Sequence, residues 1–234
     1  MAVRIINLID LTHTLDSTIP TWEGDCGFNL IVESNYQDGK PPVQFCIQSF
    51  VCKAGIGTHL DAPRHSFAAG ASVAQLPLKR LVCPLYVMDV SMRSHADYQI
   101  SVDDIVAFEK QHGAIAAGGL FIGYTGWDMF WHDGVAYRNV DEDGVMHFPR
   151  FSIDAAALLL KRGVAGIGID TLSPDGADYT FPVHQLILGN GGYIIENVAH
   201  AKLVPPVGAL AVVAPLKVKD GTEAPIRLMA MVVV

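Results

Sequence analysis

The chain has 234 residues, of which half are hydrophobic and only 17% are charged. Its 16 basic and 24 acidic side chains give a formal net charge of -8, which argues against nucleic-acid and anionic-membrane partners, because both need clustered Lys and Arg. So much apolar surface excludes intrinsic disorder and predicts a single folded domain over residues 1–234. It also favours burial of surface between identical subunits.

The four cysteines are too few for a disulfide scaffold in a chain of this length, and no pair has the CxxC spacing of zinc or redox sites. We therefore expect reduced thiols in a cytoplasmic protein. The N-terminal segment lacks the long apolar stretch of a signal peptide. No uncharged run reaches the roughly 20 apolar residues of a membrane helix, so we expect a soluble protein.

The N-terminal third has the pattern of β structure. Ile5–Leu11 is a short apolar strand, and Phe28–Ser34 alternates as a strand does. Val43–Cys52 is apolar enough to predict a covered strand. The segment Ser17–Gly27 is interrupted by Pro and Gly and predicts a loop, and a further strand is predicted at Leu85–Val90.

The middle of the chain alternates between helix and strand signals. Ser101 is suited to cap a helix that runs to about Gln111, and Ser152 is suited to cap a helix over Asp154–Arg162. Each helix precedes a short apolar run typical of a buried strand, at Gly119–Thr125 and Gly166–Ile169. Strand, helix and strand in this order predict parallel crossover units.

A long segment, Trp127–Phe151, separates these units, and loops of this length inside a domain usually have a function. The end of the chain returns to strands, at Tyr193–Val198, Leu210–Leu216 and Ile226–Val233. We therefore predict an α/β fold with a mixed sheet, which is parallel in the middle of the chain and antiparallel at the chain ends.

The stretch G-I-G-T-H-L-D-A-P-R-H, which ends at His65, carries the strongest chemical signal. His59 and Asp61 are two residues apart, so an extended backbone places both side chains on one face, as a divalent metal site requires. Pro63 then turns the chain, which allows His65 to return toward the site without being a ligand. The pattern is short, and ordinary surface or core histidines would also produce it.

A second histidine and acid pair strengthens the metal interpretation. Glu196 lies inside an apolar strand pattern, where an unpaired carboxylate would be costly, and His184 precedes it. A metal ion would explain the buried carboxylate. Trp22 is a bulky aromatic residue in a loop without apolar neighbours, which indicates a role other than core packing.

Together these segments resemble the cyclase family of metal-dependent hydrolases, which includes bacterial kynurenine formamidase and isatin hydrolase. The resemblance covers nearly the whole chain and implies a swivelling β/β/α architecture. It rests on these segments in chain order: Asp10-Leu-Thr-His13, Pro20-Thr-Trp-Glu-Gly-Asp25, Gly57 to His65, Tyr124-Thr-Gly-Trp127, Gly168-Ile-Asp-Thr171, the His184 and Glu196 pair, Val204-Pro-Pro, Ala214-Pro-Leu and Pro225-Ile-Arg.

The resemblance also implies roles for single residues. His65 matches the proton donor and acceptor of the family, and Trp22 matches an aromatic residue of the substrate pocket, to which we add Trp127. The residues that match metal ligands are His59, Asp61, His184 and Glu196. This mixed set of nitrogen and oxygen ligands suits Zn or Mn.

One position departs from the formamidase pattern, which has a histidine where this chain has Gly55. That histidine completes one of two ligand sets bridged by the residue that matches Asp61. Its absence leaves one full set, so we expect one tightly bound divalent ion per subunit.

The resemblance implies a hydrolase that cleaves an amide bond of a small aromatic substrate, such as N-formylkynurenine or isatin, by metal-activated water. The partners expected are this substrate and further copies of the chain, as a homodimer or homotetramer. Two alternatives stay open. One is lactone hydrolysis or a cyclase and dehydratase reaction on the same fold. The other is a metal-binding protein without catalysis, which Gly55 suggests.

Overall fold

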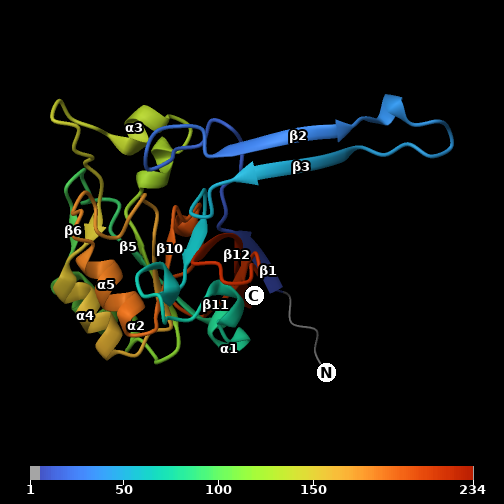
Figure 1. Cartoon of the computed structure of the whole chain (residues 1–234). Coiled ribbons are helices and arrows are strands. Elements are labelled where there is room, and N and C mark those ends of the chain that lie inside the picture. The colour runs from blue at the N-terminus through green and yellow to red at the C-terminus, as the bar shows by residue number, and fades with distance from the viewer. Residues whose placement is uncertain (1–5, 234) are drawn as a thin grey trace, which may run out of the picture.

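A closed β-barrel forms the centre of the molecule (Figure 1). The computed structural model describes residues 6–233. Around the barrel the strands follow the order β12-β11-β5-β7-β9-β10-β4, and β4 pairs again with β12. Their bounds are β4 His59–Asp61, β5 Val82–Asp89, β7 Leu120–Tyr124, β9 Gly166–Ile169, β10 Tyr193–Glu196, β11 Ala209–Pro215 and β12 Glu223–Val233. A further strand, β1 (Ile6–Asp10), pairs with β12 outside the ring; Ile5, where this strand was predicted to begin, lies outside the described residues.

The barrel is mixed in the way that the sequence predicts. The pairs β5–β7 and β7–β9 from the middle of the chain are parallel, as predicted. The pair β9–β10 is also parallel, although Tyr193–Val198 was predicted among the antiparallel strands at the end of the chain, because β10 follows β9 through the crossover helix α5. The remaining pairs, which involve β4, β11 and β12, are antiparallel. The predicted mixed α/β class is confirmed, whereas the swivelling β/β/α arrangement stays a prediction.

Side chains alternate between the inside and the outside of the barrel. Leu60, Ile122 and Ile195 belong to the buried cluster that fills the interior. Their neighbours Phe121 and Ile194 point outward into a second cluster, shared with α2, α4 and α5. The outer face of β10 therefore meets the helical layer, in which α5 packs beside it.

The described helices are short, and two of them begin where the sequence predicts. The Ser101 hydroxyl accepts from the amide of Asp104 at the start of α2, and the Ser152 hydroxyl accepts from Ala155 at the start of α4. The bounds are α1 Leu78–Leu81, α2 Val102–His112, α3 Gly134–Arg138, α4 Ile153–Lys161 and α5 Pro182–Gly189. The helix α5 was not predicted, because a helix of eight residues with an apolar composition has too few turns to show a helical period.

A two-stranded arm, β2 (Phe28–Ser34) and β3 (Ile47–Cys52), projects away from the barrel (Figure 1). The prediction of a covered strand over Val43–Cys52 is wrong. The strand begins at Ile47, and Phe50 and Val51 are 54% and 65% exposed. An apolar sequence indicates that a strand is more stable when its side chains are buried. It does not indicate whether the same chain or another molecule buries them.

The predicted long loop after β7 is largely folded. It contains α3, a short 3-10 helix at Trp127–Phe130, and the strand β8 (Arg150–Phe151), which pairs with β6 (Gln99–Ile100). Asp170, at the end of β9, accepts hydrogen bonds from the amides of Thr125 and Trp127 and so fixes the start of this loop. All four cysteines are free thiols. Among the described residues, no helix combines the length and apolar character needed to cross a bilayer.

We predict that Gly166→Ala lowers the free energy of unfolding by about 1–3 kcal/mol, measured by urea denaturation. A Cβ on Gly166 would lie 2.5 Å from the ring of Tyr193 and 2.6 Å from its backbone oxygen, so β9 and β10 would have to separate. Gly134→Ala is the control, because a Cβ there meets nothing within 4 Å and the residue begins a helix. Equal denaturation midpoints for both variants would contradict the packing argument.

Candidate metal centre

The register of β4 with its two neighbours gathers acidic and imidazole side chains on one outer face of the barrel. His59 of β4 lies opposite Glu196 of β10, and Asp61 lies opposite Glu223 of β12. Directly opposed residues in antiparallel strands place their side chains on the same face. The helix α5 packs beside β10 and adds His184 to this face.

The structure brings together all four side chains that match metal ligands. Nε2 of His59 lies 3.2 Å from Oε2 of Glu196 and 3.7 Å from Oδ1 of Asp61. Nε2 of His184 lies 3.3 Å from Oε1 of Glu196 and 3.5 Å from Oδ2 of Asp61. Each carboxylate therefore directs one oxygen toward each imidazole. All four residues are buried.

Both imidazoles are held with Nε2 toward the carboxylates. Nδ1 of His59 lies 2.8 Å from the carbonyl oxygen of Gly57, and Nδ1 of His184 lies 2.6 Å from Oδ2 of Asp175. A carbonyl oxygen and a carboxylate can only accept, so each Nδ1 must donate, and Nε2 is the nitrogen left to bind an ion. Asp175 also accepts from the amide of Val183 and thereby holds the first turn of α5.

Sequence reasoning missed Asp175. It stands nine residues before His184 in a loop, and the local pattern gives no sign of the contact. If α5 had been predicted, its unpaired N-terminal amides would have suggested an acidic capping residue such as Asp175.

The electrostatics of the cluster favour a bound cation. Burial alone would lower the pKa of His59, but the hydrogen bond to Glu196 and the charges of Asp61 and Glu196 outweigh it and raise the pKa to about 10. Burial would raise the pKa of Glu196, but hydrogen bonds from His184 and His59 hold it below its usual value. The carboxylate of Glu196 thus stays ionised and draws positive charge into the site.

An unpaired carboxylate oxygen gives separate support for a divalent ion in this cluster. Oδ1 of Asp61 is buried and has no hydrogen-bond partner among the described residues. A buried carboxylate oxygen without a partner is costly, and a cation would satisfy it. The atoms of His59, Asp61 and Glu196 that could ligate a metal all lie within 4.8 Å of one another, close enough to share one ion. Two imidazoles and two carboxylates suit Zn or Mn.

A cavity of about 290 Å³ opens above the cluster. Trp22 and Phe181 form an aromatic wall, with ring centroids 6.0 Å apart, and Trp22 also meets Tyr179 edge to face. The predicted pocket residue Trp22 therefore lies in the same cavity as the ligand cluster. An aromatic wall beside buried polar groups is typical of a small-molecule site.

His65 lines the same cavity, and a carboxylate that sequence reasoning missed holds it there. Nδ1 of His65 lies 2.9 Å from Oε2 of Glu223. This hydrogen bond raises the pKa of His65. Glu223 is the first residue of β12, directly after a polar turn far along the chain, and only the pairing of β12 with β4 places it opposite Asp61.

The structure does not bring Trp127 to this cavity. The residue is buried, its Nε1 donates to the carbonyl oxygen of Tyr137 at 2.8 Å, and its ring meets Phe130 edge to face. Trp127 belongs instead to the aromatic cluster beneath the long loop.

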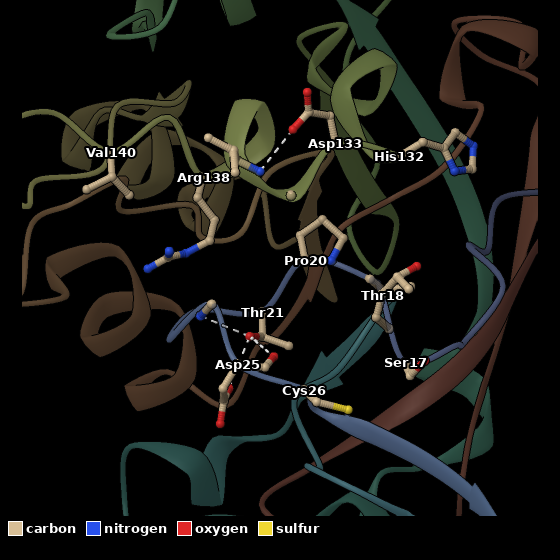
Figure 2. A pocket seen from close by; sticks show the side chains of 14 residues that line it. Ser17, Thr18, Pro20, Thr21, Asp25, Cys26, His132, Asp133, Arg138 and Val140 are labelled. Carbon is tan, nitrogen blue, oxygen red and sulfur yellow. Dashed lines mark hydrogen bonds between the residues drawn. The ribbon is translucent and has the colours of Figure 1, made fainter.

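A second hollow, of about 580 Å³, shares Pro20 and Thr21 with this cavity as lining residues. Figure 2 shows Arg138 and Thr21 on its wall. The guanidinium of Arg138 donates to the carbonyl oxygen of Trp22 at 3.2 and 3.0 Å, so this wall supports the loop that carries Trp22. The hollow is lined by none of the four predicted metal ligands.

Asp175→Asn is expected to weaken the binding of a divalent ion about 10- to 100-fold, measured by competition with a chromophoric chelator. The amide oxygen can still accept from Val183, so α5 keeps its cap. The amide nitrogen, however, can donate to Nδ1 of His184, which favours the tautomer with a proton on Nε2 and blocks that nitrogen as a ligand.

Asp178→Asn is the control for this prediction. Asp178 lies in the same loop, but its carboxylate accepts from Thr180. Equal metal affinities in the two variants would show that Asp175 does not orient His184.

Comparison with known proteins places the fold and the cluster in a family. Residues 9–176 match the Cyclase family, described as "Putative cyclase". Isatin hydrolase of Roseibium aggregatum is 35% identical over 188 residues, which cover 75% of this chain and 71% of the relative. Kynurenine formamidase of Salinibacter ruber is 26% identical over 223 residues, with 94% and 95% covered. A crystal structure of an isatin hydrolase bound to the product analogue thioisatinate has a TM-score of 0.89 and 29% identity, and covers 98% of this chain and 93% of that one. The chain therefore belongs to the cyclase family and is homologous to isatin hydrolase and kynurenine formamidase.

Proposed function

We propose that this protein is a metal-dependent hydrolase that cleaves a carbon–nitrogen bond in a small aromatic amide. The observation that carries the proposal is the buried cluster of His59, Asp61, His184 and Glu196 at the base of a cavity with an aromatic wall. The substrate classes that we propose are aryl formamides such as N-formylkynurenine and cyclic amides such as isatin. The named activities of two relatives and the thioisatinate bound to a third support this choice.

The proposed roles follow from the positions of the side chains. A divalent ion, when bound by the four ligands, supplies an acidified water molecule and polarises a carbonyl group. His65 borders the same cavity and moves the proton to the leaving nitrogen, as its matching residue does in the family. Trp22 and Phe181 hold the flat ring of the substrate by stacking or edge contacts.

We infer one tightly bound ion per subunit, Zn or Mn, held by the most deeply buried ligands. Trp127 was expected to bind the substrate. We propose instead that it supports the long loop, because its side chain bonds to Tyr137 and does not line the cavity. We further propose that residues 1–234 act as a single domain of the swivelling β/β/α type in the cytoplasm. The four free thiols support that location.

We also propose that the arm of β2 and β3 binds a second copy of the chain, in a homodimer or homotetramer. An isolated two-stranded ribbon is marginally stable in water, so the arm benefits from a surface that covers it. Its exposed apolar side chains are Leu30, Ile31, Val32, Ile47, Phe50 and Val51, and Val43 and Phe45 in the segment that joins the two strands are exposed as well. Exposed apolar surface of this kind marks interaction sites.

His65→Ala should keep the bound metal but lose about 10²- to 10⁴-fold in turnover of N-formylkynurenine or isatin, because a general acid or base contributes about that much. Glu196→Ala should instead lose the metal and melt at a lower temperature, since a bound ion stabilises the folded state by mass action. Elemental analysis and initial rates on both substrates measure these effects.

Loss of the ion in His65→Ala would reassign this residue as a ligand. An intact ion without turnover of aryl amides by the wild type would point to metal binding without catalysis.

Phe50→Lys is expected to reduce the mass in solution toward that of a monomer, measured by size-exclusion chromatography with light scattering. Phe50 stands on the exposed arm, and burying an unpaired charge there would oppose association. Val135→Lys is the control, because Val135 is 84% exposed on α3, outside the arm. A wild-type protein that is already monomeric would contradict the proposed assembly.

A further inference from the structure

We propose that the Ser173 hydroxyl donates a hydrogen bond to a carbonyl group on the aromatic ring of the substrate, at the ring position next to the amide nitrogen. The inference rests on the function proposed above and names the substrate feature that the cavity recognises, an aryl amide with an ortho carbonyl. Isatin and N-formylkynurenine both have a carbonyl group at this position of the ring.

Ser173 lies in the loop between β9 and α5, and it lines the same cavity as the metal ligands. Its Oγ accepts from the amide of Asp175 at 3.2 Å, and the carboxylate of Asp175 holds His184. The loop ends at Phe181, which belongs to the aromatic wall of the cavity. Ser173 is therefore carried by the segment that joins the ligand cluster to the aromatic wall.

Hydrogen bonds hold the backbone around Ser173 in place. Oγ1 of Thr171 lies 3.0 Å from the carbonyl oxygen of Pro149 and 3.1 Å from that of Ser173. The amide of Asn197, which follows Glu196, donates to the carbonyl oxygen of Thr171 at 3.0 Å. Ser173 itself is only 2% exposed. A hydroxyl on such a fixed backbone loses little freedom when a ligand binds, which favours a directed hydrogen bond.

The Ser173 hydroxyl accepts a hydrogen bond, but its own proton is donated to none of the described residues. The cavity is lined by two other buried side chains that are polar and uncharged, and both donate within the protein. Oγ1 of Thr21 and Nδ2 of Asn197 each donate to a backbone carbonyl oxygen, at 2.8 and 2.9 Å. A buried donor without an acceptor is costly, and an oxygen atom of a ligand would satisfy it.

The position of Ser173 indicates which substrate oxygen it meets. In the proposed function the ligand cluster takes the amide that is cleaved, and Trp22 and Phe181 contact the ring. A hydroxyl between these two groups requires an acceptor that is attached to the ring close to the amide. A carbonyl oxygen in the ortho position is such an acceptor, and it can only accept, which matches the donor that Ser173 offers.

The test compares two aryl formamides, 2-formamidoacetophenone, which has an ortho carbonyl, and formanilide, which has none. Initial rates with the purified full-length protein give kcat/KM for each. The wild type should prefer 2-formamidoacetophenone, and Ser173→Ala should reduce this preference by roughly 3- to 10-fold, the usual contribution of one hydrogen bond. A preference in Ser173→Ala as large as that of the wild type would overturn the inference.

Thr21→Val is the control, because Thr21 is a buried residue of the same cavity whose hydroxyl already donates to a backbone carbonyl oxygen. A change in loop structure lowers kcat/KM for both formamides alike, so this variant should keep the preference of the wild type. Ser173→Ala also removes the acceptor of the Asp175 amide, and the ratio of the two substrates separates this structural effect. Equal losses for both substrates in Ser173→Ala would leave Ser173 with a structural role alone.

Binding of the two product amines tests Ser173 without turnover. Titrations followed by nuclear magnetic resonance give the Kd of 2-aminoacetophenone and of aniline for the same proteins. The wild type should bind 2-aminoacetophenone more tightly, and Ser173→Ala should lose this preference by the same factor. A wild type that hydrolyses neither formamide would contradict the proposed function, and the amines then decide on Ser173 by themselves. An unchanged preference between the amines in Ser173→Ala would overturn its role.

Thermal melting monitored by circular dichroism shows whether each variant is folded. If Ser173→Ala does not fold, Ser173→Cys replaces it, because a thiol is close to a hydroxyl in size but is a weak donor. Ser173→Cys should lose part of the preference in both measurements. A preference equal to that of the wild type would again overturn the inference.

Discussion

The position of β4 between β10 and β12 is the constraint on which the site depends. This strand has three residues, yet it closes the barrel, and its antiparallel register with both neighbours brings two distant acidic residues beside His59 and Asp61. A shift of one residue would turn these side chains into the apolar interior, which Leu60 now fills. The hydrophobic core of the barrel therefore specifies the geometry of the polar cluster on its outer face.

The cost of burying charge explains why these residues need a cation. Buried carboxylates are stable only when they are paired or bound to an ion. His59 and His184 offer one solution, because the surrounding carboxylates raise the pKa of both imidazoles and favour their protonated forms. That solution still leaves Oδ1 of Asp61 without a partner. A divalent ion neutralises the carboxylates and engages this oxygen in addition.

Part of this arrangement could be predicted from the sequence, and the limit has a physical cause. The pair of His59 and Asp61 is local, so the two-residue period of a strand was enough to place both side chains on one face. The alternation of helices and strands likewise predicted the parallel half of the barrel. Asp175 and Glu223 were missed because each reaches the site through a tertiary contact, one at the start of α5 and one across a strand pair. No local pattern encodes such contacts.

Burial of the arm of β2 and β3 could not be predicted from a local pattern either. The apolar pattern of Val43–Cys52 correctly indicated a strand near its C-terminal end, but hydrophobicity does not state which surface covers it. The departure at Gly55 is a further example. Taken alone, it suggested a lost ligand, whereas in the fold a Cβ at this position would lie only 3.0 Å from Oε2 of Glu223. A missing motif residue is informative only once its spatial neighbours are known.

The buried cluster is proposed to bind a divalent metal ion between its imidazoles and carboxylates. Crystals of the purified protein, measured with X-rays just above and just below the absorption edge of Zn and of Mn, test it directly. We expect an anomalous peak, present only above the edge of the bound element, in contact with His184, Asp61 and Glu196. Crystals grown with added Zn²⁺ or Mn²⁺ that show no peak at this position would contradict it.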